Sequence, residues 1–544
     1  MTSDIKNLQY AIIFGLISTV VIITPTLSID PINLPKFVTL SFFAVMIFTY
    51  IVSNRQLSIL KSKFALLLLA LFPSWILISL FMSKINILNG LFGFTGRNTG
   101  TLTYFGLFIF MIGGIVASST SFAYSILRAI SVAGILHITY GFVQVLNLDP
   151  FAWVRATGSV TSFFGNQNFS SSFTALSMLA SLSLILHSSS NKMTRIFWIC
   201  YQPFAFFILI NSDSTQGYFV LIAGLLVFGY FWLVSKPNLI RLAKIYLVMC
   251  VCGVAISILD ILAKVPWKPF LNEATVALRG DYWRTAWAIS MNNPLFGVGL
   301  DGYVYQYRAF RDELTASRAG NTRVDSAHNI FLDLLVGGGF PLLIIYLGLI
   351  LLVLISIFKV MQRSKVFKPE YACLVGAWVG YLLQASISIN QIGLGVIGFT
   401  LMGVLIGYES HQEYEQKLPS QKQRRSTAYA LLLSSIFSVF ITFPVFRNDL
   451  NLRSAANAAD AALVEKIAYD WPKQIDFMVT VAATLRENGY PEHSLRVIRE
   501  VIKINPNFYE AWLEISRNEM ASESEKNKAQ VLLRKLDPFA PVIG

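Results

Sequence analysis

Hydrophobic runs of about 20 residues follow one another along most of the chain, with short polar segments between them. A helix of that length crosses the hydrocarbon core of a bilayer, so each run predicts one membrane span. Beyond residue 446 the long runs stop, and shorter amphipathic patterns of helical period take their place. The pattern predicts an all-α polytopic membrane domain of about 12–13 transmembrane helices over 1–446, followed by a helical region over 447–544. The predicted spans are 8–28, 34–53, 64–82, 101–119, 122–146, 168–187, 194–211, 216–234, 239–263, 329–358, 371–389, 392–408 and 427–446.

Composition agrees with this architecture, because 55% of the 544 residues are hydrophobic and only 13% are charged. A soluble protein of this length needs much less apolar surface. The first run, Tyr10 to Ser28, is too long for the hydrophobic region of a cleaved signal peptide, so it is interpreted as the first span.

The net charge of +13 does not call for a nucleic-acid partner, since Lys and Arg collect in the cytoplasmic loops of membrane proteins. With the N-terminus in the cytoplasm, every clearly basic short loop falls on one side, and an odd number of spans places 447–544 outside. The long loop over 264–328 is then extracytoplasmic as well. A long translocated segment escapes the charge bias, but its arginines still need an explanation. They are Arg279, Arg284, Arg308, Arg311, Arg318 and Arg323.

The polar C-terminal region carries the pattern of a helical repeat. Pro472 and Pro506 are 34 residues apart, and Gly489 lies where a turn between two helices would fall. This period is typical of tetratricopeptide repeats, with one clear unit at about 475–508. The alternative is an ordinary helical hairpin domain, and in either form His493 is interpreted as a solvated helix residue. Either form offers a surface for a partner protein.

Arginines in the predicted outside loops are the first candidates for chemistry. Arg284 lies in "DYWRTAWAISMNNP", which predicts an amphipathic helix that ends at the Asn-Asn-Pro, and Arg97 and Arg155 lie in two other outside loops. A guanidinium at the membrane boundary favours an anion such as a lipid phosphate or pyrophosphate. The alternative for Arg284 is an ion pair with Asp281 or a side chain that reaches the lipid headgroups.

The segment "PLFGVGLDGY" follows that helix, and its Gly297 and Gly299 permit tight backbone turns. No alternation of strands and helices surrounds it, which argues against a dinucleotide site. The chain also has no Walker-type phosphate loop, so it is not expected to drive transport with ATP.

His328 stands in "DSAHNIF", at the start of a predicted membrane helix whose first turn Asp325 and Ser326 could cap. An ordinary imidazole pKa of about 6.5 leaves histidine largely neutral at pH 7, as a general base requires. The alternative is a packed or solvated histidine without a chemical role.

The block "RTAWAISMNNPLFGVGLDGYVYQY…DSAHNIFLDLLVGGGFPLL" resembles the characteristic region of the bacterial O-antigen ligase/polymerase superfamily. "GRNTG" and "FFGNQNF" resemble outside loops of its members. The resemblance implies a GT-C-like glycosyltransferase of lipopolysaccharide or surface-polysaccharide biosynthesis. Arg284 would hold the pyrophosphate and His328 would activate the acceptor hydroxyl. Arg97, Arg155, Asn329, Gly297 and Gly299 would contact substrate.

One departure from the family is Gln216, which stands where many members have a further arginine. Arg97 or Arg155 could supply that charge. Neither a metal nor a cofactor is expected. The implied partners are an undecaprenyl-pyrophosphate-linked glycan as donor, an acceptor and the bacterial inner membrane, with a protein partner for the repeats as a further possibility.

Three acceptors stay open: a lipid A core sugar, a growing polysaccharide chain, or a protein Ser/Thr. Ligase or polymerase activity ranks first and protein O-oligosaccharyltransferase activity second. The rival class is a transporter or flippase of lipid-linked sugars, which predicts polar residues at mid-membrane and inverted repeats. A membrane scaffold that carries repeats is the third class.

Overall fold

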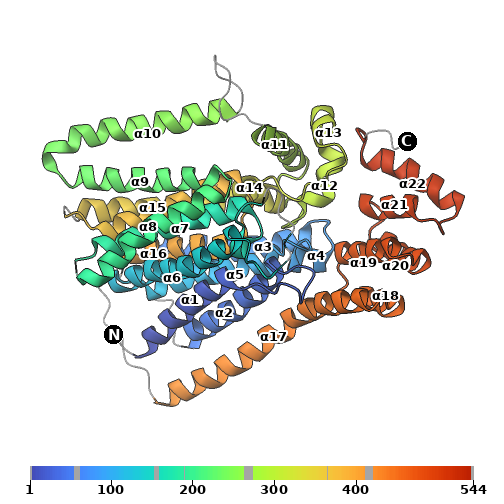
Figure 1. Ribbon diagram of the computed structural model, residues 1–544, viewed down its shortest axis with the longest axis horizontal. Coiled ribbons are helices and arrows are strands. Elements are labelled where there is room, and N and C mark those ends of the chain that lie inside the picture. The colour runs from blue at the N-terminus through green and yellow to red at the C-terminus, as the bar shows by residue number, and fades with distance from the viewer. Residues whose placement is uncertain are drawn as a thin grey trace.

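The computed structural model describes residues 3–53, 62–151, 153, 158–188, 190–261, 274–363, 366–410 and 421–540. Within these ranges the chain forms 22 α-helices, two short 3-10 helices and no strand, which confirms the predicted all-α class (Figure 1). Nine of the described helices are long and apolar enough to cross a membrane, and three shorter apolar helices pack among them. The protein is therefore a multi-pass membrane protein.

Every predicted span coincides with a helix of the structure. The first helix is shorter at its C-terminal end than predicted, because Pro25 disfavours a helical conformation of the residue before it. The last one is longer, since α17 continues without interruption past residue 446. The helices at the predicted positions are α1 (Ser3–Val21), α2 (Asn33–Ser53), α3 (Lys63–Met82), α5 (Thr101–Ala117), α6 (Thr120–Val145), α7 (Gln167–Leu186), α8 (Lys192–Asn211), α9 (Gln216–Val234), α10 (Ile240–Ile261), α14 (Ile330–Arg363), α15 (Pro369–Ile387), α16 (Ile392–Ser410) and α17 (Gln421–Asn457).

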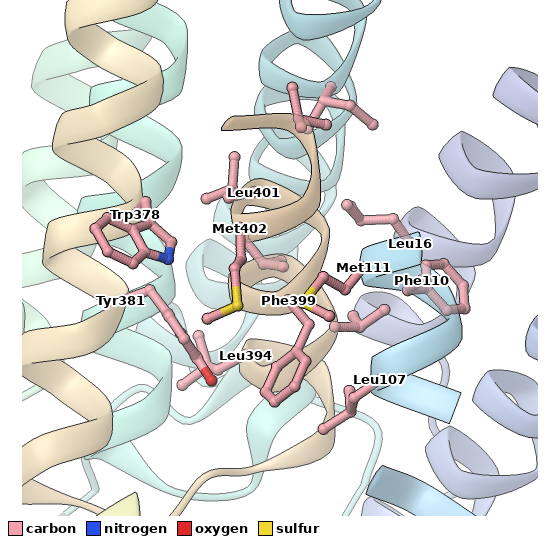
Figure 2. Packing of buried hydrophobic residues seen from close by; sticks show 14 of the residues in the cluster. Leu16, Leu107, Phe110, Met111, Trp378, Tyr381, Leu394, Phe399, Leu401 and Met402 are labelled. Atoms are coloured by element: carbon pink, nitrogen blue, oxygen red, sulfur yellow. The ribbon is translucent and has the colours of Figure 1, made fainter. Parts of the chain in front are cut away.

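The centre of the bundle is α16, whose described residues are almost all buried. Figure 2 shows Phe399 and Met402 of α16 between Met111 of α5 and Tyr381 of α15. A Cβ added at Gly403 would lie 2.0 Å from the Met111 carbonyl oxygen, so only glycine permits this approach of α16 to α5. The bundle thus has a close-packed interior, which provides a rigid base for the loops at the end predicted to be extracytoplasmic, called the outside end below.

The helix α14 breaks at Gly339, where φ is 70° and ψ is −175°, and Pro341 lies two residues further on. Residues 330–338 form a short first segment at the end of the bundle that faces the C-terminal helices. The short helices of the outside loops gather at the same end (Figure 1). They are α4 (Ile87–Phe92), α11 (Ala274–Asn292), α12 (Tyr303–Phe310) and α13 (Glu313–Ala319).

The C-terminal region is a set of short amphipathic helices with a hydrophobic core of its own. Gly489 adopts a φ of +85° in the turn between α19 and α20, which confirms the predicted hairpin. His493 lies on α20 with its side chain partly exposed, as expected, and its Nδ1 is 2.6 Å from the Glu465 carboxylate. The tetratricopeptide relationship stays a prediction. The helices are α18 (Ala461–Tyr469), α19 (Ile475–Glu487), α20 (Pro491–Ile504), α21 (Tyr509–Arg517) and α22 (Glu523–Leu536).

Two arginines of the long outside loop are accounted for by this C-terminal region. Arg311 donates from Nε and Nη2 to Asp537, at 3.0 and 2.7 Å, and both side chains are fully buried. Arg308 donates to Asp537 at 3.2 Å and to Glu510 at 3.3 Å. A second contact joins Asp476 to Asn89 of α4. The C-terminal helices are therefore docked on the outside loops by charge pairs that water does not reach.

Candidate functional site

The segment before α14 holds His328 in an uncommon backbone conformation, with a φ of +56°. A non-glycine residue pays about 1–3 kcal/mol for such a conformation, so the surrounding contacts must impose it. The Ser326 hydroxyl accepts the His328 backbone N–H at 2.9 Å. Asp333, one turn into α14, accepts the Ser326 hydroxyl at 2.8 Å and the Ala327 N–H at 2.9 Å. The backbone that carries the imidazole is therefore fixed at several points.

The cap of α14 differs from the expectation that Asp325 and Ser326 would provide it. Asn329 caps the helix, because its Oδ1 accepts the N–H groups of Phe331 at 2.9 Å and Leu332 at 3.2 Å. Its Nδ2 donates to the Ser386 carbonyl at 2.8 Å. Both ends of the Asn329 side chain are thus engaged in structural hydrogen bonds, and its contact with substrate stays a prediction.

The hydrogen bonds of the imidazole determine which ring nitrogen can accept a proton. Nδ1 of His328 lies 3.1 Å from the Ser326 carbonyl oxygen. A carbonyl can only accept, so Nδ1 carries the hydrogen and Nε2 carries the lone pair. Burial lowers the pKa of His328 below its ordinary value, and Arg97 and Arg279 lower it further, although Asp325 opposes them. The ring is therefore neutral at pH 7, with Nε2 available as a base.

Arg279 is the arginine of α11 that lies close enough for its charge to lower the pKa of His328. Tyr282, one turn along the same helix, has its ring 5.4 Å from the imidazole. In the described part of the chain Arg279 has no hydrogen-bonded or acidic partner, and burial lowers the pKa of its guanidinium. A half-buried guanidinium without a counter-ion is a favourable site for an anionic ligand.

Arg284, by contrast, already has two acidic partners. Its Nε donates to Asp312 at 2.9 Å and its Nη2 donates to Asp281 at 2.8 Å. Hydrogen bonds from Arg284 and Thr315 outweigh burial and lower the pKa of Asp312 to about 2, so that partner is charged. This is the ion pair that the sequence offered as the alternative for Arg284. Direct binding of pyrophosphate by this residue stays a prediction.

Arg97 links three segments at the outside end of the bundle. Its Nη1 donates to the Asp325 carbonyl at 2.5 Å, and its Nη2 lies 3.5 Å from Asp301. Burial lowers the pKa of Arg97, but Asp301 and Asp325 raise it by more, so the guanidinium stays charged. Asp301 also accepts the N–H groups of Phe94 and Thr99, at 3.0 and 2.9 Å. Arg97 thus positions the backbone just before His328.

A small cavity adjoins this arginine and is lined by Arg97, Asp301, Tyr303 and Asp325. Neither His328 nor Arg284 is among the described residues that line it. Arg155, the other arginine expected to supply charge, lies outside the described residues. The structure therefore brings Arg97 and Arg279 toward His328 and leaves Arg284 in a separate ion-pair cluster.

The predicted tight turn at "PLFGVGL" is confirmed, with φ values of +63° at Gly297 and +89° at Gly299. Val298 donates its backbone N–H to Val336 at 2.8 Å, and Gly299 donates to Gly337 at 3.0 Å. A Cβ added at Gly297 would lie 2.3 Å from the Val336 carbonyl oxygen. The glycines therefore let the turn pair with the backbone of the broken helix α14, and their contact with substrate stays a prediction.

Gln216, at the position where the resembled family often has an arginine, is buried at the start of α9. Neither its Oε1 nor its Nε2 has a hydrogen-bond partner within the described part of the chain. An uncharged amide cannot replace a guanidinium at this position. Among the described arginines of residues 94–100 and 274–328, Arg279 is the one without an acidic partner.

A comparison with known protein families finds a match that includes the segments of this site. A family model described as O-Antigen ligase matches residues 204–347, which run from α8 past the break in α14. The match contains Arg279, Arg284, Gly297 and His328, but it covers less than half of the chain. No curated protein matches the sequence significantly.

The lack of an acidic neighbour at Arg279 could have been recognised from spacing alone. On a helix, residues three or four positions apart are neighbours. Arg284 has Asp281 three positions before it, whereas the neighbours of Arg279 at these spacings are Thr275, Val276, Tyr282 and Trp283. The sequence therefore marks Arg279 as the arginine of α11 without an acid on its own face.

Proposed function

We propose that this protein transfers an undecaprenyl-pyrophosphate-linked glycan to an acceptor hydroxyl at the outer face of the bacterial cytoplasmic membrane. The observation that carries the proposal is the pair formed by Arg279, a guanidinium without a counter-ion, and His328, whose Nε2 is available as a base. The O-antigen ligase match over residues 204–347 supports the same reaction class.

The two side chains suit the attacking group and the leaving group of the reaction. The acceptor oxygen attacks the anomeric carbon, and the bond from that carbon to the pyrophosphate oxygen breaks. Nε2 of His328 takes the proton of the acceptor hydroxyl, a contribution of roughly 10²–10⁴-fold for a positioned base. The pyrophosphate leaves with the bonding electrons, and Arg279 stabilises the charge that develops on it. Because pyrophosphate is a good leaving group, no covalent enzyme intermediate is needed.

In this proposal Arg279 takes the part that the family resemblance suggested for Arg284. Arg284 would then act indirectly, by holding α11 against α13 through Asp312. Arg97 would position the segment of His328 through its bond to the Asp325 carbonyl. The glycan would be a surface polysaccharide or O-antigen unit, so ligase or polymerase activity ranks first.

The direct test is transfer by the purified protein in lipid nanodiscs. The donor is undecaprenyl-pyrophosphate glycan extracted from the host, and the acceptors are lipid A core, a second molecule of donor and a Ser/Thr-rich peptide. We expect product with a glycan acceptor, and product with the peptide alone would indicate protein O-oligosaccharyltransferase activity. No product with any acceptor, together with movement of the donor across proteoliposome membranes, would identify a flippase and refute the proposal.

A further inference from the structure

A groove of about 1980 Å³ separates the membrane domain from the docked C-terminal helices. One wall comes from the end of α3, the start of α4 and residues 292–298, and the other comes from α21 and α22. The helix α12 forms the floor, with Tyr305, Gln306 and Arg308 among the lining residues. Figure 1 shows α12 between the outside end of the bundle and these C-terminal helices.

Buried contacts on both sides keep this groove in a fixed shape. Arg308 of the floor is bonded to Asp537 and Glu510 of the C-terminal wall, and its guanidinium lies 4.1 Å from the centre of the Tyr509 ring. Tyr305 donates to Asp476 at 3.2 Å. Because these contacts are shielded from water, the two walls cannot separate without breaking buried charge pairs. The groove is therefore preformed, as binding sites usually are.

The lining chemistry matches sugars better than peptides. Carboxamides are both donors and acceptors, as sugar hydroxyls are. A peptide helix would need a continuous apolar stripe, which this mixed lining does not offer. The carboxamide and tyrosine residues of the groove are Asn86, Asn292, Asn293, Tyr305, Gln306, Asn505, Asn507 and Tyr509.

Two lysines add positive charge on opposite walls of the groove. Lys84 lies between α3 and α4, and Lys535 lies on α22. Both are exposed, and neither has an acidic partner among the residues that the structure describes. This charge favours a glycan that carries carboxylate or phosphate groups.

We propose that this groove binds several sugar units of a glycan substrate beyond the unit that reacts. The turn that includes Gly302 is the common wall of this groove and of the cavity at Arg97, so the bound chain would lie next to that cavity. Exposed Met82 and Leu295 at its lower edge would adjoin the lipid that anchors such a glycan. The inference rests on the proposed function and adds the substrate class that the C-terminal helices recognise.

Binding can be measured without any transfer. The probes are oligosaccharides of one to ten repeat units, released by mild acid from the host's lipid-linked glycan, and titrated onto the full chain in nanodiscs. We expect affinity to rise at least tenfold between one unit and the longest chains. Asn507→Trp, which fills the groove from an exposed turn, should remove most of that gain, whereas Asn527→Trp on the exposed face of α22 should keep it. Lys84→Glu should weaken acidic oligosaccharides more than neutral ones.

A transfer assay with the same variants distinguishes whether the bound glycan belongs to the donor or to the acceptor. A higher KM for the donor alone in Asn507→Trp assigns the groove to the donor glycan, and a higher KM for the acceptor alone assigns it to the acceptor. Equal affinity of Asn507→Trp and Asn527→Trp for every chain length would overturn the inference, as would tight binding of a Ser/Thr-rich peptide in place of the glycans. Length-dependent binding without any transfer would refute the proposed function and leave the groove intact.

Discussion

Replacing Asp537 with alanine removes the carboxylate that two arginines of the long outside loop share. Arg311 donates to it twice, at 3.0 and 2.7 Å, and Arg308 donates once, at 3.2 Å. The Asp537 and Arg311 side chains are fully buried and Arg308 is 7% exposed, so water cannot take the place of the carboxylate. After the substitution Arg308 would keep Glu510, but Arg311 would keep only the Gly320 carbonyl.

Removal of one partner from a buried ion pair costs about 3–5 kcal/mol, because the remaining charge stays buried without compensation. The lower value corresponds to a change of about 100-fold in an equilibrium constant. We therefore expect the C-terminal helices to detach from α12 at least about 100-fold more often in Asp537→Ala than in the unaltered protein. The membrane helices, which do not contact Asp537, should keep their stability.

Hydrogen exchange of the full chain in nanodiscs measures this detachment. Amide protection in α12 and α22 should fall by about 100-fold in Asp537→Ala, while α5 should keep its protection. Glu500→Ala is a matched control, since Glu500 pairs with Lys503 where both side chains are exposed, and such pairs contribute about 0–1 kcal/mol. The double variant Arg311→Met/Asp537→Leu should recover part of the protection, because it leaves fewer buried charges unpaired. Unchanged protection in Asp537→Ala, or an equal loss in Glu500→Ala, would refute this account of docking.

Three further predictions concern the proposed site. Arg279→Ala should lower the initial rate of transfer by about 10²–10³-fold, as the loss of one stabilising donor does, and Arg284→Ala should lower it far less. The reverse order would assign pyrophosphate binding to Arg284. Burial lowers the pKa of His328. Activity should therefore persist as the pH falls to 6.5 and be lost at lower pH, when Nε2 becomes protonated. A midpoint above 6.5 in the pH–rate profile would contradict this assignment. Gly297→Ala should lower the thermal unfolding temperature, because its Cβ would meet the α14 backbone at a residue with positive φ. Gly280→Ala should leave the unfolding temperature unchanged, because open space surrounds that position. Equal unfolding temperatures of the two variants would show that the turn does not need glycine.

The membrane domain was predictable because lipid imposes a strict rule on the sequence. Every backbone polar group in the hydrocarbon must be satisfied within its own segment, so each long apolar run becomes a helix. All thirteen predicted spans accordingly coincide with helices. The break at Gly339 was not predicted, since it depends on the turn at 294–299, which pairs with α14 from a different part of the chain.

Partners of the arginines were much harder to predict than the helices. Asp537 and Arg311 are separated by more than two hundred residues, and no local sequence pattern predicts a contact between them. The cap at Asn329 shows the same limit over a short distance, because Asp325, Ser326 and Asn329 are all chemically able to cap a helix. Tertiary contacts determine which candidate caps the helix. The Ser326 hydroxyl donates to Asp333 and accepts the His328 N–H, so it does not cap α14.

The central claim is that His328 accepts the proton of a glycan acceptor beside Arg279. Its most direct test is the initial rate of glycan transfer by His328→Ala, measured in nanodiscs at pH 7.5 against His493→Ala, which removes a histidine of the C-terminal region. The account predicts that His328→Ala loses at least about 100-fold in rate while donor binding and protein yield stay normal, and that His493→Ala keeps the full rate. Full transfer by His328→Ala would contradict it.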